Sequence, residues 1–466
     1  MARLVIGTSK AKTVPAVVKE VGPEHYIEKT LDANGKLLNG STIISFDGVI
    51  DLGESVLRQA YYYNSSVSGV VNFPDLENVT GASALFECFY HCSGITGVSF
   101  PKLETITANY CFQSAFGYTG ITSVSFPKLK TVNGTNCFSY AFSNSPITSL
   151  SFDELETING NGPFINICYM CSGLKSALFP KLKTISLSSF ASCFNDSSFY
   201  YCPLETIDFH SLETVNGAAF GQVFKNKTTI TGNLDLSKLK TVSGNGAFKQ
   251  CFNGCSGITG LDLSSLETIN GSDCFSSAFS GIRATGVLSF PSLRSITGNS
   301  ACAYMFTGAV PVSVVKFQSL NSVKSTWCMG NFLYAAPNLT DMYFYALDTN
   351  SFGSYTNQFN GMLGNTSGVT VHFPMRIQAT IGSWADVTAG FGGTNTTVLF
   401  DIVTSLTGAD TNTYARQEKD STATATAWVY NDTLYYTSGA TEPSVGNNIY
   451  SDSACSIVAT TVSAIA

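Results

Sequence analysis

The sequence is poor in charge for its length. Asp, Glu, Lys and Arg make up 12% of its 466 residues, whereas a quarter is usual. The net charge of −7 and the lack of a basic stripe argue against nucleic acid binding. No run of 18 apolar residues is present, so we expect no membrane-spanning helix. Serine, threonine, asparagine and glycine must therefore supply the polar surface.

Sequence motifs of catalysis are also missing. The four histidines form no HExxH motif and no pair at ligand spacing, and no GxSxG, Walker A or GxGxxG motif follows a strand. His210 and His372 fall at strand positions, where a surface location is favoured over contact with a ligand. We therefore expect a protein that is not an enzyme, with no catalytic residue, no metal site and no cofactor.

The opening segment does not resemble a secretory signal. Its apolar run, Leu4 to Gly7, is short, and Lys10 and Lys12 follow closely. We expect that the chain is exported by another route, stays inside the cell, or leaves as part of a particle.

What the sequence has is a repeat. An aromatic or leucine anchor, often within Ser-Phe-Pro, recurs mostly every 26 or 27 residues, with longer steps ending at Phe209 and Phe373. The anchors are Phe46, Phe73, Phe100, Phe126, Phe152, Phe179, Phe209, Leu236, Leu263, Phe290, Phe317, Phe344 and Phe373. A period of this length indicates stacked units, each too small to bury its own apolar face.

Columns inside the repeat predict its local structure. Apolar, polar and apolar residues alternate up to the anchor, as in Val98-Ser99-Phe100, which predicts a short half-buried strand. Inward Leu and Ile or Val follow, and a Gly eight residues after many anchors, such as Gly134, indicates a tight turn. Apolar residues then recur four apart, as at Phe112 and Phe116, which predicts a short helix.

This combination resembles the leucine-rich-repeat superfamily, and most closely its BspA-type repeats of bacterial surface proteins. The resemblance covers roughly Ile43 to Pro374. It implies an α/β fold: a leucine-rich-repeat-like solenoid with one short parallel strand and one short helix per repeat of about 27 residues. We therefore predict three parts: residues 1–42 as an N-terminal cap or attachment segment, 43–374 as the solenoid, and 375–466 as a small all-β module with a hairpin around Asn431-Asp432.

The fourteen cysteines fit core positions better than zinc or disulfide sites. Many share columns of the repeat, such as Cys111, Cys137 and Cys274. Columns that hold Cys in one repeat and Ala or Ser in another are typical of small buried side chains. Cys168 and Cys171 form a lone CxxC without the second pair that a four-ligand zinc site requires. Free thiols agree with folding in a reducing cytosol.

Charges in the repeats alternate in sign. The residue four positions after the anchor alternates between Glu and a basic residue along the chain. These residues are Glu104, Lys130, Glu156, Lys183, Glu213, Lys240, Glu267 and Arg294. Stacked neighbours lie about 4.8 Å apart, so we expect a ladder of opposite charges that specifies the register of the stack. A ligand site is the less favoured interpretation.

The two ends resemble proteins of phage particles. The opening is similar to the N-termini of virion proteins from tailed, crAss-like phages of gut Bacteroidota. The stretch Thr441 to Cys455 resembles a motif near the ends of phage fibres and gut-bacterial surface proteins. This resemblance implies a fibre or decoration protein that attaches to virion proteins through residues 1–42, is located in the virion after folding in the host cytoplasm, and forms a homotrimer. A cap over the first repeat is the alternative role for that segment.

One outward residue per strand is expected to form a strip. Its middle holds three carboxylates, Asp208, Asp235 and Asp262, and Tyr343 lies further along. We predict these four as ligand-binding residues for a host-surface glycan or protein, because three like charges in a row repel unless a cation or polyhydroxylated ligand relieves them. Solvent screening alone is the alternative. A BspA-type adhesin of the bacterial cell surface is the rival function, and a glycan hydrolase using two of these carboxylates is a second rival.

Overall fold

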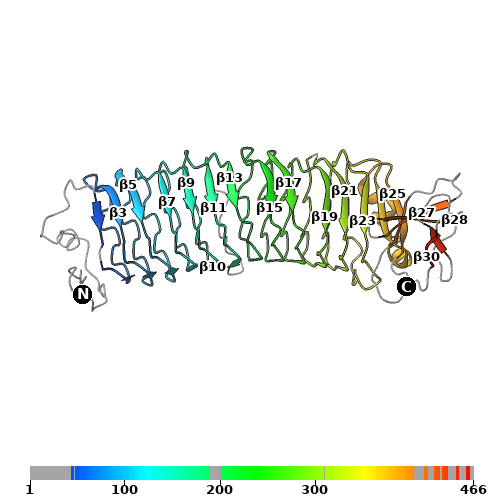
Figure 1. The fold of residues 1–466 in the computed structure, drawn as a ribbon, viewed down its shortest axis with the longest axis horizontal. Coiled ribbons are helices and arrows are strands. Elements are labelled where there is room, and N and C mark those ends of the chain that lie inside the picture. Colours follow the sequence, from blue (N-terminus) through cyan, green and yellow to red (C-terminus); the bar gives the residue numbers. More distant parts are fainter. Residues whose placement is uncertain are drawn as a thin grey trace. The chain divides into compact units, whose positions relative to one another are not determined.

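The computed structural model describes residues 43–46, 48–187, 199, 201–308 and 310–403, together with five strands of the C-terminal part. The chain divides into two compact units. Unit 1 ends at Leu263 and also includes Asn270–Arg283, whereas unit 2 comprises Ser264–Ile269 and Ala284 onward. Together they contribute about 12 turns of a parallel-strand solenoid with very little helix (Figure 1).

In each turn, one strand contains the anchor residue or ends just before it, and we call these the anchor strands. Phe100 and Phe126 are buried, and the rings of successive anchors stack, as at 5.3 Å between these two. This confirms the predicted short parallel strand. In unit 1 the anchor strands are β1 Ile43–Ser45, β3 Ser68–Asn72, β5 Gly94–Ser99, β7 Ser123–Ser125, β9 Ser149–Ser151, β11 Ser176–Leu178, β13 Thr206–Asp208, β15 Gly232–Asp235 and β17 Ile258–Asp262.

Unit 2 continues the same pattern past the predicted boundary at residue 374. Strand β25 pairs in parallel with β24, and the rings of Phe373 and Phe400 lie 5.8 Å apart. Phe400 is therefore one more anchor, 27 residues after the last one that the periodicity identified. The anchor strands of unit 2 are β19 Gly286–Phe290, β21 Val312–Phe317, β23 Asp341–Phe344, β24 Thr370–Pro374 and β25 Thr397–Val403.

A second strand follows each anchor strand, and we call these the threonine strands because most begin with Thr. Their middle residues, such as Val132 and Ile158, are fully buried. In unit 1 they are β2 Asp51–Leu52, β4 Asn78–Val79, β6 Thr105–Ile106, β8 Thr131–Asn133, β10 Thr157–Gly160, β12 Thr184–Leu187, β14 Thr214–Asn216 and β16 Thr241–Ser243. Strand β18 Thr268–Asn270 spans the division, and β20 Ser295–Ile296 and β22 Ser322–Val323 belong to unit 2.

The predicted short helix of each repeat is not confirmed. The segment is a run of turns, the turn ribbon, in which every fourth residue has a positive φ, as at Ser114 (52°) and Tyr118 (56°). The Ala115 N–H donates to Phe112 O at 3.1 Å, but the Phe112 N–H donates to Cys137 O of the next coil at 2.7 Å. Alternate amides thus close turns and join coils, which gives a four-residue period without the i→i−4 bonds of an α-helix.

The C-terminal part is not purely β. Four short helical segments precede β25: η1 Met375–Ile377, α2 Gln378–Ile381, α3 Ala385–Thr388 and η2 Gly390–Gly392. The all-β prediction for residues 375–466 is therefore not confirmed. The predicted hairpin is confirmed, since β27 Ala425–Tyr430 pairs antiparallel with β28 Thr433–Ser438. Strands β26 Tyr414–Gln417, β29 Asn448–Tyr450 and β30 Val458–Thr461 extend the same sheet.

Candidate functional site: the outward face of the anchor strands

The predicted strip of outward residues forms in both units. In unit 1, Asn72 is paired with Ser99, Ser125 with Ser151, and Asp235 with Asp262. Leu178 lies between Ser151 and Asp208 in the same register, a position that the predicted strip omitted. In unit 2 the corresponding residues Ser289, Lys316, Tyr343 and His372 follow one another.

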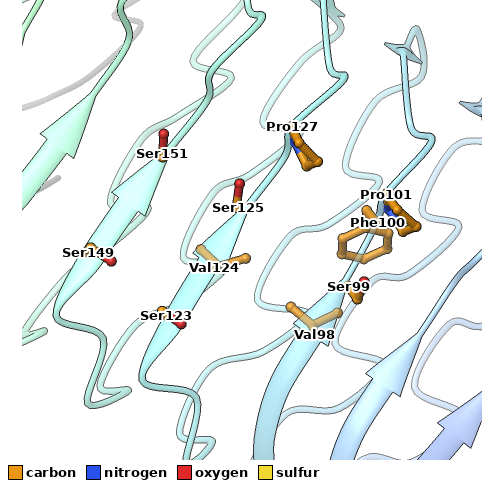
Figure 2. Close-up of a pocket in the computed structure, with 10 residues that line it drawn as sticks. All are labelled: Val98, Ser99, Phe100, Pro101, Ser123, Val124, Ser125, Pro127, Ser149 and Ser151. Atoms are coloured by element: carbon orange, nitrogen blue, oxygen red, sulfur yellow. The ribbon is translucent and has the colours of Figure 1, made fainter.

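A shallow groove opens on this face in unit 1 (Figure 2). It has a volume of about 460 Å³ and is lined by serine hydroxyls, together with the rings of Pro101 and Pro127. Its hydroxyl-bearing residues are Ser99, Ser123, Ser125, Ser149 and Ser151. The groove lies where the sheet is interrupted, because β5 and β7 are not hydrogen-bonded neighbours although β3–β5 and β7–β9 are.

Backbone hydrogen bonds mark the same interruption. The anchor N–H donates to the next strand at Phe73, which bonds Ser99 O at 3.0 Å, and at Phe126, which bonds Ser151 O at 3.2 Å. Among the described residues no such bond joins Phe100 to Ser125. Sequence reasoning missed this site, since the Val-Ser-Phe-Pro segments on both sides of the gap are identical.

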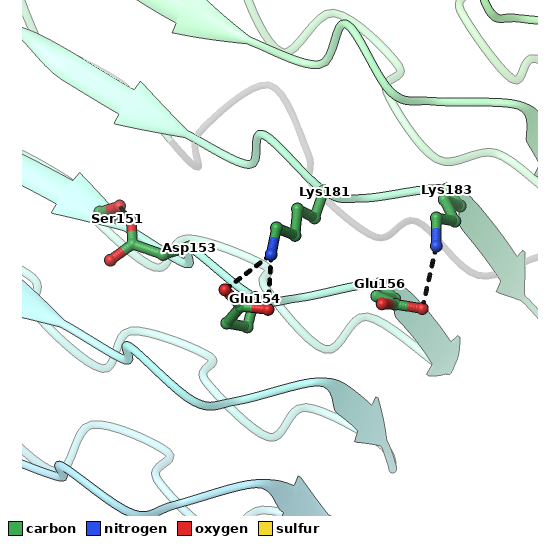
Figure 3. A network of polar contacts seen from close by, with 6 residues as sticks. All are labelled: Ser151, Asp153, Glu154, Glu156, Lys181 and Lys183. Carbon is green, nitrogen blue, oxygen red and sulfur yellow. Dashed lines mark hydrogen bonds and ion pairs between the residues drawn. The ribbon is translucent and has the colours of Figure 1, made fainter.

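Asp153 sits at the edge of the groove and orients two of its hydroxyls. Ser151 Oγ donates a hydrogen bond to Asp153, and Ser125 Oγ lies 3.5 Å from the same carboxylate. The neighbouring charges are engaged with each other: Lys181 Nζ lies 2.7 Å from Glu154 and Lys183 Nζ lies 3.2 Å from Glu156 (Figure 3). The groove itself therefore offers hydroxyls and one carboxylate rather than a strong charge.

The charge ladder predicted from alternation is confirmed as discrete pairs. Three of its bases contact the glutamate of the preceding coil, with Nζ–O distances of 2.9 Å for Lys130–Glu104, 3.2 Å for Lys183–Glu156 and 2.9 Å for Lys240–Glu213. The side chains are about half exposed, so each pair stabilises by only ~0–1 kcal/mol.

Two of the three carboxylates of the predicted strip are hydrogen-bonded within their own strand ends. Asp208 Oδ1 lies 2.6 Å from His210 Nδ1 and accepts the His210 N–H at 3.1 Å. Asp235 Oδ1 accepts the Ser237 N–H at 2.9 Å, and hydrogen bonding by Ser237 lowers the pKa of Asp235. Asp262 stands next to Asp235 in register. These bonds relieve part of the repulsion that motivated the prediction.

Tyr343, the fourth predicted site residue, belongs to an aromatic row in unit 2. Its ring stacks on His372 at 4.3 Å and on Tyr345 at 5.7 Å. His372 is only 2% exposed, and its Nε2 lies 3.3 Å from Asp341 Oδ1. The expectation that His372 is a surface residue was wrong, because the flanking Tyr343 and Asp341 cover the ring. The hydrogen bond from His372 lowers the pKa of Asp341.

The cysteines of the described part are free and buried, as predicted for Cys111, Cys137 and Cys274. Their thiols donate to backbone carbonyls: Cys255 Sγ to Phe224 O at 2.9 Å and Cys171 Sγ to Phe142 O at 3.0 Å. Ser145 Oγ makes the equivalent bond to Phe116 O at 2.9 Å. Cys and Ser thus make the same bond at this position, which explains why they exchange in the column. No three His, Cys, Asp or Glu of the described residues gather into a metal site.

Stacked coils with a polar outward face define a repeat scaffold of the kind that binds ligands along its surface. The BspA type leucine-rich-repeat region matches residues 85–220 and 181–324, together just over half of the chain. The chain belongs to the BspA-type leucine-rich-repeat family, which suggests a role in recognition or adhesion.

Comparison with solved structures finds a match to the crystal structure of a TLR13–ssRNA13 complex. Identity is 14% over 70% of this chain and 60% of that chain, with a TM-score of 0.16. No curated protein matches the sequence. In the part of the chain that the structure describes, no helix is long and apolar enough to cross a membrane.

Proposed function

We propose that the protein is a non-enzymatic recognition protein that binds a polyhydroxylated ligand, a surface glycan, on the outward face of the anchor strands of unit 1. The observation that carries this proposal is the serine-lined groove between β5 and β7. Serine hydroxyls both donate and accept hydrogen bonds, and carboxylates such as Asp153 accept them. This set of groups matches the hydroxyls of a sugar. Asp208, Asp235 and Asp262 extend the same polar face toward β17.

The state of the carboxylates supports binding over glycan hydrolysis. A glycosidase needs one carboxylic acid whose pKa is raised so that it can protonate the leaving group. Hydrogen bonding by Ser237 instead lowers the pKa of Asp235, and Asp208 is paired with His210. A carboxylate whose pKa is lowered, as that of Asp235 is, suits a hydrogen-bond acceptor role better than the proton-donor role of a glycosidase acid.

The particle on which the protein is displayed is also part of the proposal. We infer a phage virion, with the protein as a fibre or decoration protein attached through residues 1–42 and assembled as a trimer. The resemblance of the opening and of Thr441 to Cys455 to phage proteins supports this; the opening lies outside the described residues, and of the second segment the structure describes β29 Asn448–Tyr450. A BspA-type adhesin on a bacterial surface is the second candidate, favoured by the family itself.

Binding of the purified full chain to cells of gut Bacteroidota and to a glycan array tests the recognition. Ser125→Arg fills the groove and should reduce binding at least tenfold, because the long side chain occupies the ligand position. Asn133→Arg is the matched control, since Asn133 is an exposed residue of a threonine strand and its substitution leaves the groove intact. Equal binding of Ser125→Arg and the parent would contradict the groove as the site.

The strip residues need their own variant. Asp208, Asp235 and Asp262 changed together to Asn should weaken binding if they contact the ligand. If this triple variant binds like the parent and is only more heat-stable, the three carboxylates are solvated surface.

Attachment is tested by removing residues 1–41. The truncated protein should stay soluble and bind glycan but should be absent from purified phage particles. Full incorporation of the truncated protein would refute the attachment role.

A further inference from the structure

A group of exposed aromatic side chains lies on the turn ribbons of the first coils of unit 1, outside the groove. We call it the aromatic cluster: Tyr62, Tyr63, Tyr90, His91 and Tyr118. Tyr62 is 43% exposed, Tyr63 57% and Tyr118 39%. A contiguous patch of exposed rings is a common sign of a binding surface, whereas single exposed rings are ordinary.

The rings hold one another in two rows. Tyr63, His91 and Tyr118 stack with centroid distances of 4.3 and 4.1 Å and interplanar angles of 13° and 10°. Tyr62 and Tyr90 form the second row at 5.6 Å and 11°. The two rows meet edge to face at 62° between Tyr62 and Tyr63. Rings fixed in this way lose little further freedom when a ligand binds.

The backbone beneath the first row is strained for such residues. Tyr63, His91 and Tyr118 have φ values of 57°, 60° and 56°, where a bulky side chain costs about 1–2 kcal/mol. Equivalent ribbon positions in later coils of unit 1 also have a positive φ and hold Asn144, Met170, Tyr201, Asn226, Gly254 and Gly281. Four of these six are Asn or Gly, which adopt this conformation easily. The fold therefore does not require aromatic residues here, and their presence points to a function.

The charges of the polar groups beside the rings cancel. Gln59 Nε2 donates to Glu87 Oε2 at 2.8 Å, and the guanidinium carbon of Arg58 lies 4.3 Å from the centroid of Phe86. Desolvation, and then the charge of Glu87, raise the pKa of Tyr62, so its hydroxyl remains a hydrogen-bond donor at neutral pH. One carboxylate and one guanidinium favour neither an anionic polymer nor a cation.

The exposed area of the cluster by itself matches a small ligand better than a protein interface. At about 200 Å² per aromatic side chain, the exposed parts of Tyr62, Tyr63 and Tyr118 sum to roughly 300 Å². Each partner of a stable protein complex contributes about 800 Å². The surface suits a small ligand with apolar faces and neutral polar groups.

We propose that the aromatic cluster binds a short segment of a neutral saccharide. The C–H faces of the sugar rings pack on the exposed tyrosines, while Glu87, Gln59 and the phenol hydroxyls hydrogen-bond its hydroxyls. This inference rests on the proposed glycan recognition and adds a second site with different chemistry. The groove offers hydroxyls and a carboxylate, whereas the cluster offers rings.

An array of neutral oligosaccharides, printed beside sialylated, sulfated and phosphorylated glycans, tests this with the full chain. The parent should bind at least one neutral glycan. The double variant Tyr63→Asn/Tyr118→Asn should bind it at least tenfold more weakly, and it should fold well because Asn occupies the same turn at Asn144 and Asn226. Tyr304→Asn is the matched control, since Tyr304 is 40% exposed with a φ of 56° but belongs to unit 2.

The outcomes separate the two proposals. If the parent binds only charged glycans, or if the double variant binds neutral glycans like the parent, the aromatic site is refuted and glycan recognition stands. If the parent binds neither glycans nor cells, the proposed function falls and this inference falls with it.

Discussion

Single buried thiols hold the coils together by hydrogen bonding as well as by packing. Burial raises the pKa of Cys255 to about 12 and that of Cys92 to about 11. Both thiols therefore stay protonated at neutral pH, and each donates to a carbonyl of the preceding coil, Phe224 O and Tyr61 O. Reactivity of these cysteines is correspondingly low, because the thiolate is the nucleophile.

Replacing Cys255 separates the two contributions. Cys255→Ala removes one of two donors to Phe224 O, which also accepts the Lys227 N–H at 3.1 Å, and the lost hydrogen bond should lower the free energy of unfolding by about 0.5–1.5 kcal/mol. Cys255→Ser keeps the donor, as Ser145 does in its own coil, and should cost clearly less. Urea unfolding of the three proteins gives the comparison, and equal losses for Ala and Ser would show that packing alone matters.

The ribbon residues with a positive φ must also tolerate this left-handed conformation. Asn226 has a φ of 61°, and its N–H donates to Asn253 O at 2.7 Å. Asn226→Val should destabilise the protein by about 1–2 kcal/mol, because a β-branched residue resists this region. Asn226→Gly should be close to neutral. Urea midpoints measure both, and equal stability of the Val and Gly variants would contradict the assignment.

At the scale of the element, the paired charges between threonine strands should produce a pH dependence with a defined sign. Hydrogen bonding by Lys240 lowers the pKa of Glu213. A carboxylate whose pKa is lower in the folded state stabilises the protein above its unfolded value of about 4.3, and this contribution is lost as the pH falls through the folded value. Because Glu213 is 39% exposed, the effect is below about 1 kcal/mol.

Urea midpoints between pH 6 and pH 3 test this expectation. The parent should lose more stability over that range at 20 mM salt than at 0.5 M, since salt screens exposed pairs. Lys240→Met removes the partner of Glu213 and should show a smaller loss on acidification. An unchanged pH profile in that variant would show that the pair contributes nothing.

An element can be predicted from the sequence when the residues that determine its structure lie within the repeat itself. Inward positions such as Phe100 and the register of Ser125 with Ser151 follow from the period, because identical columns stack on one another. The ribbon was mistaken for a helix, since Phe112 and Phe116 have the spacing that both structures share. The conformation of Tyr118 decides between them, and a tyrosine gives no sequence signal for a positive φ.

Other features depend on contacts that the sequence does not encode locally. The gap between β5 and β7 separates two identical segments, so nothing in their residues distinguishes them. The burial of His372 results from Tyr343 and Asp341, which lie about 30 residues earlier. The coil that ends at Phe400 is hard to find in the sequence because Leu399 replaces the polar residue that usually precedes the anchor and Val403 replaces the leucine that usually lies three residues after it.

At the scale of the whole molecule, the charge pairs should destabilise a stack from which one coil has been removed. Deleting residues 153–179 of unit 1 removes one coil and joins Phe152 to Pro180. Lys128 and Lys130 then stack next to Lys181 and Lys183, which have lost Glu154 and Glu156 (Figure 3). Adjacent like charges repel, and the repulsion is screened by salt.

Salt should therefore act in opposite directions on the two proteins. Raising KCl from 20 mM to 0.5 M should raise the urea midpoint of the one-coil deletion and leave that of the parent unchanged or slightly lower. The same deletion with Lys181→Gln and Lys183→Gln should lose the gain. A deletion that responds to salt like the parent would show that the ladder does not specify register.

The gap between β5 and β7 also has a mechanical consequence. Successive coils are joined on three sides: by anchor strands, by threonine strands and by turn ribbons. At this junction the ribbon bonds remain, such as Phe112 N–H to Cys137 O at 2.7 Å, and so do those of β6 to β8. Among the described residues no strand ladder joins the third side. Tension along the stacking direction is carried there by two rows instead of three. The same holds between β13 and β15, which are also not hydrogen-bonded neighbours, so unit 1 should begin to separate at one of these two junctions, and opening at the first would widen the groove on the side where the ligand would sit.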